Sequence, residues 1–473
     1  MTKSPLYEAR CKETPPLPTS LLNLNHVPEI KSGAINESIS QLFPHLAQAK
    51  EGSSIIREPL QVGVVLSGGQ APGGHNVING LLDALEKLNP ASRLIGFLNG
   101  PKGIIENHTH ELSKDFVHSF LNTGGFDMIG SGRTKIETPD QFKASLETVK
   151  DHQLNGLVII GGDDSNTNAA LLAEYFLAHN QATAVVGVPK TIDGDLKNRF
   201  IEQSFGFDTA VKVYSEIIGN LLKDTLSAKK YWYFIKLMGR SASHITLETA
   251  LQTHPNLALI SEERRSLDEI VDDIVELIKE RAKEGKKYGA ILIPEGIIEF
   301  MPELPHGLLE GASYDSHGNL EVSKIEIERL LIEQVKKRLG TDFSFDPKPV
   351  FLGYEGRSAF PSYFDACYCY ALGHVAALLV AKQSTGRMAT VTRLKQPIES
   401  WGIQGIPLLD MLTLETRKGT LKPVIAKSLV ELDSSKYKSL KTQGLSWRME
   451  DHYRSPGPIQ FWGPKHLVEA PVF

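Results

Sequence analysis

The sequence is poor in cysteine, in long apolar runs and in excess charge of one sign. Three cysteines occur among 473 residues with no CxxC pair, so we expect no disulfide framework and a cytoplasmic location. No apolar run has membrane-spanning length, and the opening stretch MTKSPLYEARCKETPPLP contains no apolar signal core, so we expect neither a membrane partner nor a targeting peptide. The formal net charge of −5 argues against nucleic-acid binding. An anionic ligand would therefore need locally clustered cations.

Strand and helix patterns alternate along most of the chain. A chain of 473 residues is longer than one hydrophobic core usually supports, which predicts two or three domains. Amphipathic helix patterns separate the short apolar runs, and one of them opens with Ser266 and Glu269 spaced as a capping box. The apolar runs predict strands at 61–66, 93–98, 156–160, 183–188, 231–237, 289–293 and 349–353. This pattern indicates an α/β fold with mainly parallel sheets, whose ligands bind at the carboxyl ends of the strands.

The first strand run leads into the glycine-rich stretch SGGQAPGGHN. Gly68 and Gly69 would let the backbone approach a ligand closely, and Asn76 is expected to cap the next helix. The stretch matches neither a Walker loop nor the dinucleotide fingerprint. A plain strand-to-helix turn explains it equally well.

The third strand run leads into GGDDSNTNA, which places Asp163 and Asp164 at the start of a helix pattern. A capping aspartate explains one carboxylate. A Mg²⁺ ion explains the second better, because it prefers oxygen ligands and often joins one or two carboxylates to substrate phosphates.

The fourth strand run leads into PKTIDGDLKN, in which Asp193 and Asp195 lie close to Lys190 and Lys197. Turn chemistry alone accounts for the D-G pair. Two acids and two bases after a buried strand also suit a carboxylate that accepts a proton from a hydroxyl while a lysine faces a phosphate.

Further polar side chains follow other strand patterns. Each of them, taken alone, is more readily explained as part of a surface turn. Together they supply a candidate acid and several cations suited to phosphate: Arg133, Lys135, Arg240, Glu295, Tyr354 and Arg357.

Seven motifs, taken in their order along the chain, resemble those of the phosphofructokinases. The resemblance covers roughly residues 58 to 465 and is strongest to the long-type pyrophosphate-dependent branch of that family. The motifs are SGGQAPGGHN, GSGRTKIET, GGDDSNTNA, PKTIDGD, MGR, PEG and GYEGRS. The resemblance implies two Rossmann-like three-layer domains with the active site between them at the strand ends. It also implies pyrophosphate and fructose 6-phosphate as substrates, Mg²⁺ as cofactor, and a homodimer with a site shared across the interface.

The resemblance assigns a role to each matching position. Asp193 would be the base for the sugar 1-hydroxyl, and Asp163 would hold Mg²⁺ with Asp195. Gly68 and Gly69 would cradle pyrophosphate beside Arg133 and Lys135. Fructose 6-phosphate would be bound by Thr191, Ile192, Asp193, Met238, Gly239, Arg240, Glu295, Tyr354 and Arg357, with Lys230 and Tyr231 contributed across a subunit interface.

Two positions bear on the choice of phosphoryl donor. ATP-dependent relatives carry glycine where this chain has Asp164 and Lys190. An aspartate at 164 would repel the α-phosphate of ATP, and like charges about 4 Å apart repel by about 4 kcal/mol at an intermediate dielectric. Lys190 would stabilise the leaving phosphate, so both positions favour pyrophosphate.

The resemblance also predicts the domain boundaries: an N-terminal extension at 1–58, a pyrophosphate and Mg²⁺ domain at 59–205 plus about 360–450, a sugar-phosphate domain at 206–359, and a tail at 451–473. Long-type relatives carry a sizeable insertion after PEG, which is short here at about 301–314. This difference puts the assembly and regulation in question more than the activity.

Three alternatives stay open. An ATP-dependent phosphofructokinase is disfavoured by Asp164 and Lys190. A non-catalytic regulatory subunit is disfavoured by the intact TIDGD motif. A lipid or nicotinamide-nucleotide kinase with a GGD loop would not supply MGR and GYEGRS in this order.

Overall fold

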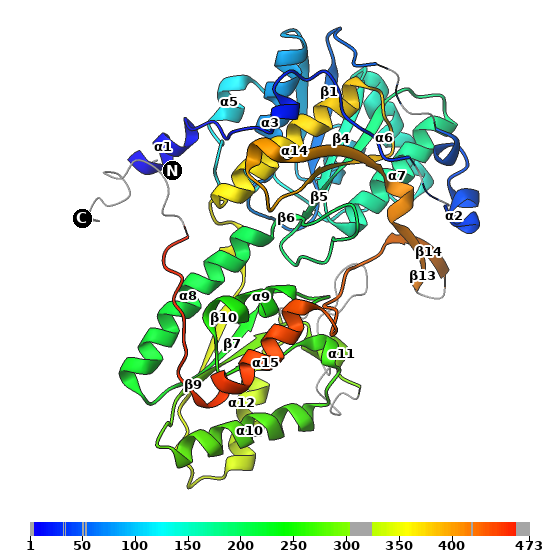
Figure 1. Ribbon diagram of the computed structural model, residues 1–473. Helices are drawn as coiled ribbons and strands as arrows, with labels where there is room; N and C mark the ends of the chain where they lie inside the picture. The colour runs from blue at the N-terminus through cyan, green and yellow to red at the C-terminus, as the bar shows by residue number, and fades with distance from the viewer. Residues whose placement is uncertain are drawn as a thin grey trace.

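The chain folds around two separate sheets. The computed structural model describes residues 4 to 459 except 32, 34, 50, 51, 53, 303–323, 418 and 419. Figure 1 shows one body built on the larger sheet and a second on the smaller sheet, with helix α8 (Phe207–Ala228) running from one towards the other. The segment at about 301–314 lies largely outside the described residues.

The larger sheet has eight strands in the order β12-β11-β5-β4-β1-β2-β3, with β6 paired to β5. Its central strands are parallel, whereas β3 and β12 run antiparallel at the two edges. The strands are β1 (Gln61–Leu66), β2 (Arg93–Phe97), β3 (Thr109–Glu111), β4 (Gly156–Gly161), β5 (Ala184–Thr191), β6 (Phe205–Gly206), β11 (Arg387–Thr392) and β12 (Gly402–Pro407).

Helices cover both faces of this sheet, because alternate strand residues enter different hydrophobic cores. Val64 of β1 packs with α3 (Gly74–Leu88) and α14 (Tyr363–Ala381), and Val65 packs with α6 (Pro139–Asp151) and α7 (Asp163–Ala178). Helices α4 (Pro101–Ile105) and α5 (Lys114–His118) complete this body. Helix α14 is long and apolar enough to cross a membrane, but 94% of its most apolar window is buried inside the protein, so it serves as a core helix.

The smaller sheet is fully parallel, in the order β10-β7-β9-β8. Its strands are β7 (Trp232–Leu237), β8 (Leu257–Ala258), β9 (Gly289–Pro294) and β10 (Pro347–Leu352). It is also covered on both faces, by α8 and α9 (His244–Thr253) on one side and by α10 (Leu267–Lys283) and α12 (Ile327–Leu339) on the other. The Ser266–Glu269 capping box is present at the start of α10, as predicted. Short helices α11 (Ile297–Phe300) and α13 (Tyr354–Arg357) follow β9 and β10.

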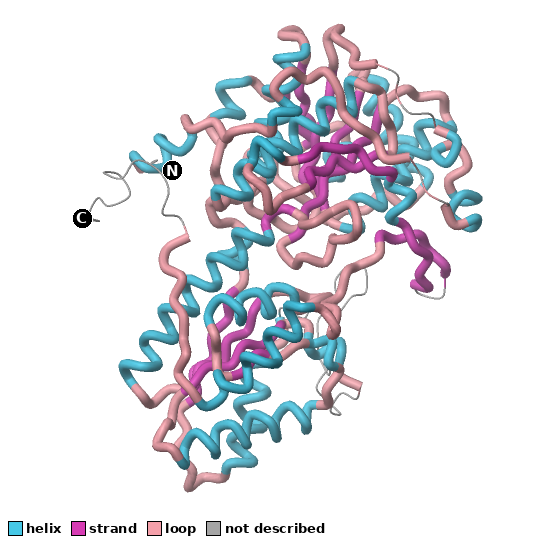
Figure 2. The backbone as a smooth tube through the Cα atoms, viewed as in Figure 1, coloured by secondary structure: helices cyan, strands magenta, loops and turns pink. Residues whose placement is uncertain are grey.

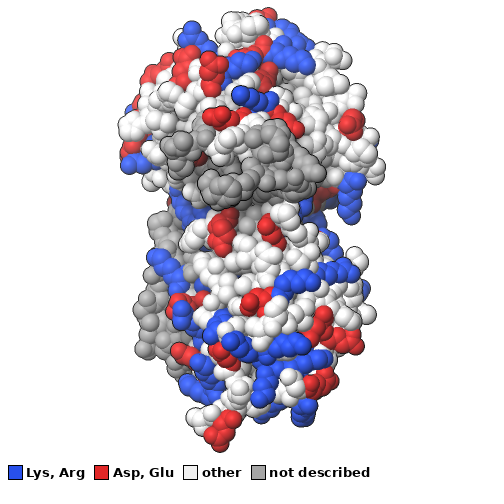
Figure 3. Space-filling model, turned by 90° about the vertical axis from the view of Figure 1, so that its left-hand side faces the viewer, with Lys and Arg blue, Asp and Glu red and all other residues white. Residues whose placement is uncertain are grey.

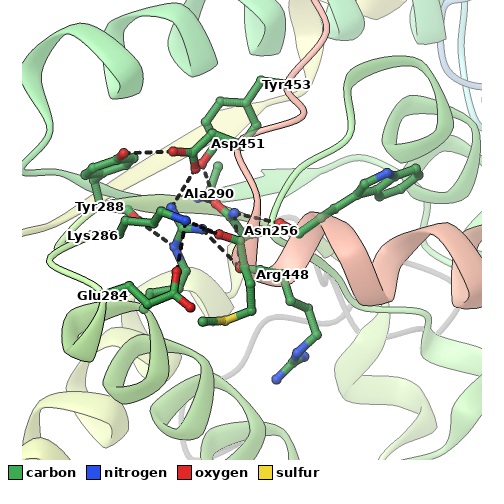
Figure 4. A network of polar contacts seen from close by, with 11 residues as sticks. Asn256, Glu284, Lys286, Tyr288, Ala290, Arg448, Asp451 and Tyr453 are labelled. Atoms are coloured by element: carbon green, nitrogen blue, oxygen red, sulfur yellow. Dashed lines mark hydrogen bonds and ion pairs between the residues drawn. The ribbon is translucent and has the colours of Figure 1, made fainter.

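The last helix, α15 (Ser435–Met449), packs against α9 and α10 of the smaller-sheet body. A polar network fixes its end (Figure 4). Asp451 accepts hydrogen bonds from Arg281 at 2.7 Å and from Tyr288 at 2.8 Å, and the Tyr453 hydroxyl donates to Asn256. Helix α15 and the residues that follow it therefore lie against the smaller-sheet body, whereas the sequence-based expectation placed residues up to about 450 in the other domain.

The segment before β1 lies along the larger-sheet body. It contains α1 (Pro5–Cys11), α2 (Glu37–Leu42) and short 3₁₀ turns. Glu29 forms a parallel bridge with Gly405 of edge strand β12, and its buried carboxylate pairs with Lys382 at 2.7 Å and Arg387 at 3.0 Å. These contacts tie the segment to the edge of the sheet.

A two-stranded hairpin, β13 (Leu412–Arg417) and β14 (Thr420–Ile425), follows the larger sheet and packs on α7. In the backbone trace it projects from the larger-sheet body before the chain turns back to the other body (Figure 2). On the face drawn in Figure 3, basic and acidic side chains occur on both bodies.

Candidate active site

The loops after β1, β4 and β5 meet because these strands are neighbours in a parallel sheet. Ser165 of α7 donates to Ser67 after β1 at 2.7 Å, and the Gly68 amide donates to the Gly132 carbonyl at 2.9 Å. The loop that carries Arg133 and Lys135 is thereby joined to the glycine loop. Asn76 lies inside α3, whose N-cap is Gly73, so the predicted capping role of Asn76 is wrong; its amide instead donates to Asn122 and Ala366.

Three cations surround the backbone at Gly68 and Gly69. Gly68 has φ +86°, and a Cβ there would lie 3.3 Å from the Lys190 ammonium. A Cβ on Gly69 would lie 3.0 Å from the guanidinium of Arg357 and 3.7 Å from that of Arg133. Glycine therefore keeps the space between a backbone turn and three positive groups open, which suits a polyanion.

Lys190 is the most buried of these cations. Its side chain is 5% exposed, and its ammonium donates to the Gly69 carbonyl at 2.6 Å. Burial, and then the neighbouring Arg357, lower the pKa of Lys190 to about 8. An anion bound in this space would stabilise the charged form of Lys190 and so oppose both effects on its pKa.

Asp163 and Asp164 form the first turn of α7, whose N-cap is Gly162. Their carboxylates have different partners. Asp164 pairs with Lys135 at 3.1 Å, and Asp163 lies 3.6 Å from the ammonium of Lys427. The two charges therefore belong to different parts of the site.

Asp193 and Asp195 flank Gly194 after β5. Gly194 has φ +74°, and a Cβ there would lie 2.9 Å from the ring of Phe207. The Asp193 amide donates to the Thr191 hydroxyl at 3.1 Å. Burial, and then the charge of Asp193, raise the pKa of Asp195 to about 7.

The smaller-sheet body brings a second set of residues to the same region. The Gly239 amide, after β7, lies 3.4 Å from Oε1 of Glu295, which follows β9. Burial, and then Asp193, raise the pKa of Glu295 to about 7, so a carboxylate from each body faces the same space. Among the described residues, Glu295 Oε2 has no hydrogen-bond partner although it is buried. It can accept a hydrogen bond from a ligand hydroxyl.

Helix α13 reaches across between the bodies. Arg357 donates to the side chain of Gln70 in the glycine loop, and its guanidinium carbon lies 5.2 Å from the Tyr354 ring centroid. Tyr354 is 58% exposed. Burial, and then Arg133, lower the pKa of Arg357. Arg357 therefore contacts the glycine loop of the larger-sheet body as well as Tyr354 of its own helix.

Lys230 and Tyr231 lie away from the other predicted site residues. They immediately precede β7, whereas Met238, Gly239 and Arg240 follow it, and a strand of this length separates them by roughly 20 Å. The ammonium of Lys230 lies 4.8 Å from the Tyr231 ring centroid. One chain alone does not bring this pair to the other predicted residues.

Three residues that were not predicted also contact residues of the candidate active site: Gln70, Ser241 and Lys427. Gln70 lies inside the first motif and Ser241 directly follows MGR, but their contacts depend on how the two bodies meet. Lys427 follows β14 in the stretch VIAKSLV, and this single lysine after an apolar run gives no motif signal.

The residues present fit a Mg²⁺ ion held jointly with phosphate. Among the described residues, no group of three or more His, Cys, Asp or Glu side chains is arranged to hold a metal. Mg²⁺ needs fewer, because it commonly takes one or two carboxylates, waters and substrate phosphates. Asp163 and Asp195 both favour the charged form of Lys427, so their carboxylates face a common space.

The phosphofructokinase family pattern matches residues 61 to 380. A pyrophosphate–fructose 6-phosphate 1-phosphotransferase from Porphyromonas gingivalis is 44% identical, over 100% of this chain and 98% of the relative. The subunit beta 2 of the enzyme of that name from Arabidopsis thaliana is 45% identical, over 98% and 92%. A solved pyrophosphate-dependent phosphofructokinase from Nitrosospira multiformis matches with a TM-score of 0.64 at 16% identity, over 86% of this chain and 95% of the other, which shows a shared fold. This chain therefore belongs to the phosphofructokinase family and has its fold of two α/β bodies with mainly parallel sheets.

Proposed function

We propose that the protein catalyses the reversible transfer of a phosphoryl group from pyrophosphate to the 1-hydroxyl of fructose 6-phosphate, giving fructose 1,6-bisphosphate and phosphate. The observation that carries this proposal is the position of Lys190. Its ammonium lies beside the glycine cradle, together with Arg133 and Arg357. The curated relatives with this activity in their names support the same assignment.

Pyrophosphate would occupy the space between Gly68, Gly69 and the three cations. Lys190 would neutralise the leaving phosphate, and Lys135, held by Asp164 at 3.1 Å, would contact the far phosphate. Asp164 would also fill the space needed by the α-phosphate of ATP. The donor site would thereby select for the smaller anion.

Fructose 6-phosphate would bind where the two bodies meet. Asp193 would accept the proton of the 1-hydroxyl as this oxygen attacks the phosphorus. Glu295 would accept a hydrogen bond from a sugar hydroxyl through its unpartnered Oε2. The other contacts would come from Thr191, Ile192, Met238, Gly239, Arg240, Tyr354 and Arg357, with Lys230 and Tyr231 supplied by a second copy of the chain in a homodimer.

Asp163, with Asp195, would hold Mg²⁺. When bound, this ion would neutralise phosphate charge that the lysines and arginines leave uncompensated. The enzyme would act in the cytoplasm.

The test is product formation by the purified chain from fructose 6-phosphate and Mg²⁺, with either pyrophosphate or ATP as donor. We expect fructose 1,6-bisphosphate from pyrophosphate and a far lower rate from ATP. Preference for ATP would identify an ATP-dependent enzyme instead, and inactivity with both donors would favour a regulatory subunit.

A further inference from the structure

Lys427 lies in a segment that crosses between the two bodies, residues 426–430. The Ser428 amide donates to the Asp195 carbonyl at 2.7 Å, and the Ser428 carbonyl lies 2.9 Å from Nε2 of His244 at the start of α9. The Val430 amide donates to the carboxylate of Glu262 at 2.9 Å. This crossing segment is therefore fastened to the loop after β5 and to the smaller-sheet body.

The ammonium of Lys427 lies between the proposed sugar-phosphate residues and the proposed donor residues. It is 2.8 Å from the hydroxyl of Ser241, next to the sugar-phosphate residue Arg240, and 3.6 Å from the carboxylate of Asp163 on the donor side. The side chain is 25% exposed. The side chain is thus largely enclosed, with about a quarter of its surface open to solvent.

Carboxylates gather around the ammonium of Lys427. Asp163 lies 3.6 Å away, and the charges of Asp195 and Asp193 also act on this ammonium. Lys427 therefore places a positive charge directly beside the proposed base and metal carboxylates.

A cation in this position has a cost for the enzyme, because it competes with Mg²⁺ for Asp163 and repels the bound ion. Its charge is useful only if a substrate anion becomes its partner. The phosphoryl group in transfer is that anion, since it must pass between the donor side and the 1-hydroxyl beside Asp193.

We propose that Lys427 is a further substrate-binding cation, which pairs with Asp163 in the free enzyme and with the phosphoryl group in transfer in the substrate complex. This inference rests on the proposed function. The flexible lysine stem allows the ammonium to exchange partners while Ser241 keeps it near the sugar side.

The test compares Lys427→Met, which keeps the stem but removes the charge, with Lys427→Arg and with the control Lys422→Met. Lys422 lies on the adjacent β14, is half exposed, and pairs with Glu137 at 3.6 Å outside the site. We expect Lys427→Met to lower kcat by about 10²-fold, as for loss of one preorganised contact to the transition state, with a smaller change in KM for fructose 6-phosphate. Lys427→Arg should restore part of the rate, and Lys422→Met should behave as wild type.

A second measurement, Mn²⁺ binding to the free enzyme by electron paramagnetic resonance, needs no turnover. Lys427→Met should bind Mn²⁺ several-fold more tightly, because a competing cation has gone. Unchanged or weaker Mn²⁺ binding, or an unchanged kcat, would overturn the inference. Inactivity of the wild-type chain with pyrophosphate would overturn the proposed function instead, and the Mn²⁺ comparison would still decide whether Lys427 competes for Asp163.

Discussion

Asp163 and Asp164 are neighbours in the chain, yet their carboxylates face different lysines. Asp163 lies near Lys427 in the segment that crosses between the two bodies, whereas Asp164 pairs with Lys135 in the loop that also carries Arg133. Successive residues in the first turn of a helix point about 100° apart, which separates the two charges. Asp164 thus has two proposed effects, since it excludes a nucleotide and fixes a cation.

The variant Asp164→Gly with Lys190→Gly should lose efficiency with pyrophosphate and gain use of ATP. The leaving phosphate loses its ammonium, Lys135 loses its partner, and the space for an α-phosphate opens. Steady-state kinetics with both donors measure the change. Unchanged pyrophosphate kinetics in the double variant would refute these roles.

Removing the carboxylate of Asp193 should affect chemistry more than binding. We expect Asp193→Ser to lower kcat by about 10²- to 10⁴-fold, because no base then accepts the hydroxyl proton, with little change in KM for fructose 6-phosphate. A thermal unfolding scan controls for folding. Turnover close to that of wild type would show that another group is the base.

The buried titratable groups predict a bell-shaped pH profile for kcat/KM. Lys190 loses its charge as pH rises through about 8, and Asp195 gains a proton as pH falls through about 7, so activity should decline on both sides. In Lys190→Arg the guanidinium stays charged, which should move the alkaline decline to higher pH. If the alkaline limbs of the two enzymes superimpose, Lys190 does not control that limb.

Among the helices, α8 and α14 meet where the chain passes between the bodies. Asp365 of α14 accepts hydrogen bonds from the Gly206 amide at 3.1 Å, the Thr209 amide at 2.9 Å and the Thr209 hydroxyl at 2.5 Å. A carboxylate of one helix therefore holds the first turn of the other. This contact sets the direction in which α8 leaves the larger-sheet body.

Asp365 should also make stability depend on pH. Burial, and then Asp208, raise the pKa of Asp365 to about 7, so between about pH 4 and 7 the folded state binds the proton more tightly than the unfolded state. Its contribution to the free energy of unfolding must fall as pH rises through this range. Urea unfolding at several pH values should show wild type losing stability relative to Asp365→Asn as pH rises. A constant difference would mean that Asp365 does not titrate in this range.

The strands that the sequence predicted are those with continuous apolar residues. All seven predicted runs are strands, with ends that differ by a few residues. The antiparallel edge strands were not predicted, because β3 has three residues and β12, GIQGIP, contains two glycines and a proline. In the site, the motifs located the strand-end residues. Contacts such as Gln70 with Arg357 depend on how the bodies meet, which local patterns do not encode.

For the molecule as a whole, the two bodies supply different halves of the site. The glycine loop and the aspartates come from the larger-sheet body, whereas Glu295 and Arg357 come from the smaller one. The crossing segment and α13 join them. A change in the angle between the bodies would therefore alter several of the proposed contacts at once.

The proposed homodimer can be tested by complementation. Asp193→Ser and a Lys230→Met, Tyr231→Ala double variant should each be nearly inactive as pure dimers. If each site combines Asp193 of one chain with Lys230 and Tyr231 of the other, refolding an equal mixture should restore about a quarter of wild-type activity, since half the dimers then have one intact site. No recovery, with mixed dimers demonstrated, would show that the site is not shared.

The bridge between Glu29 and Gly405 has a consequence for solubility. Strand β12 is the outermost strand of the larger sheet, and the Pro28–Ile30 backbone satisfies both the amide and the carbonyl of Gly405. Without that segment, these backbone groups would face solvent beside two unpaired basic side chains, Lys382 and Arg387. An uncovered edge of this kind is a template on which another chain can add a strand. We therefore expect the N-terminal segment to limit aggregation through this edge, an effect that no assay of turnover would detect.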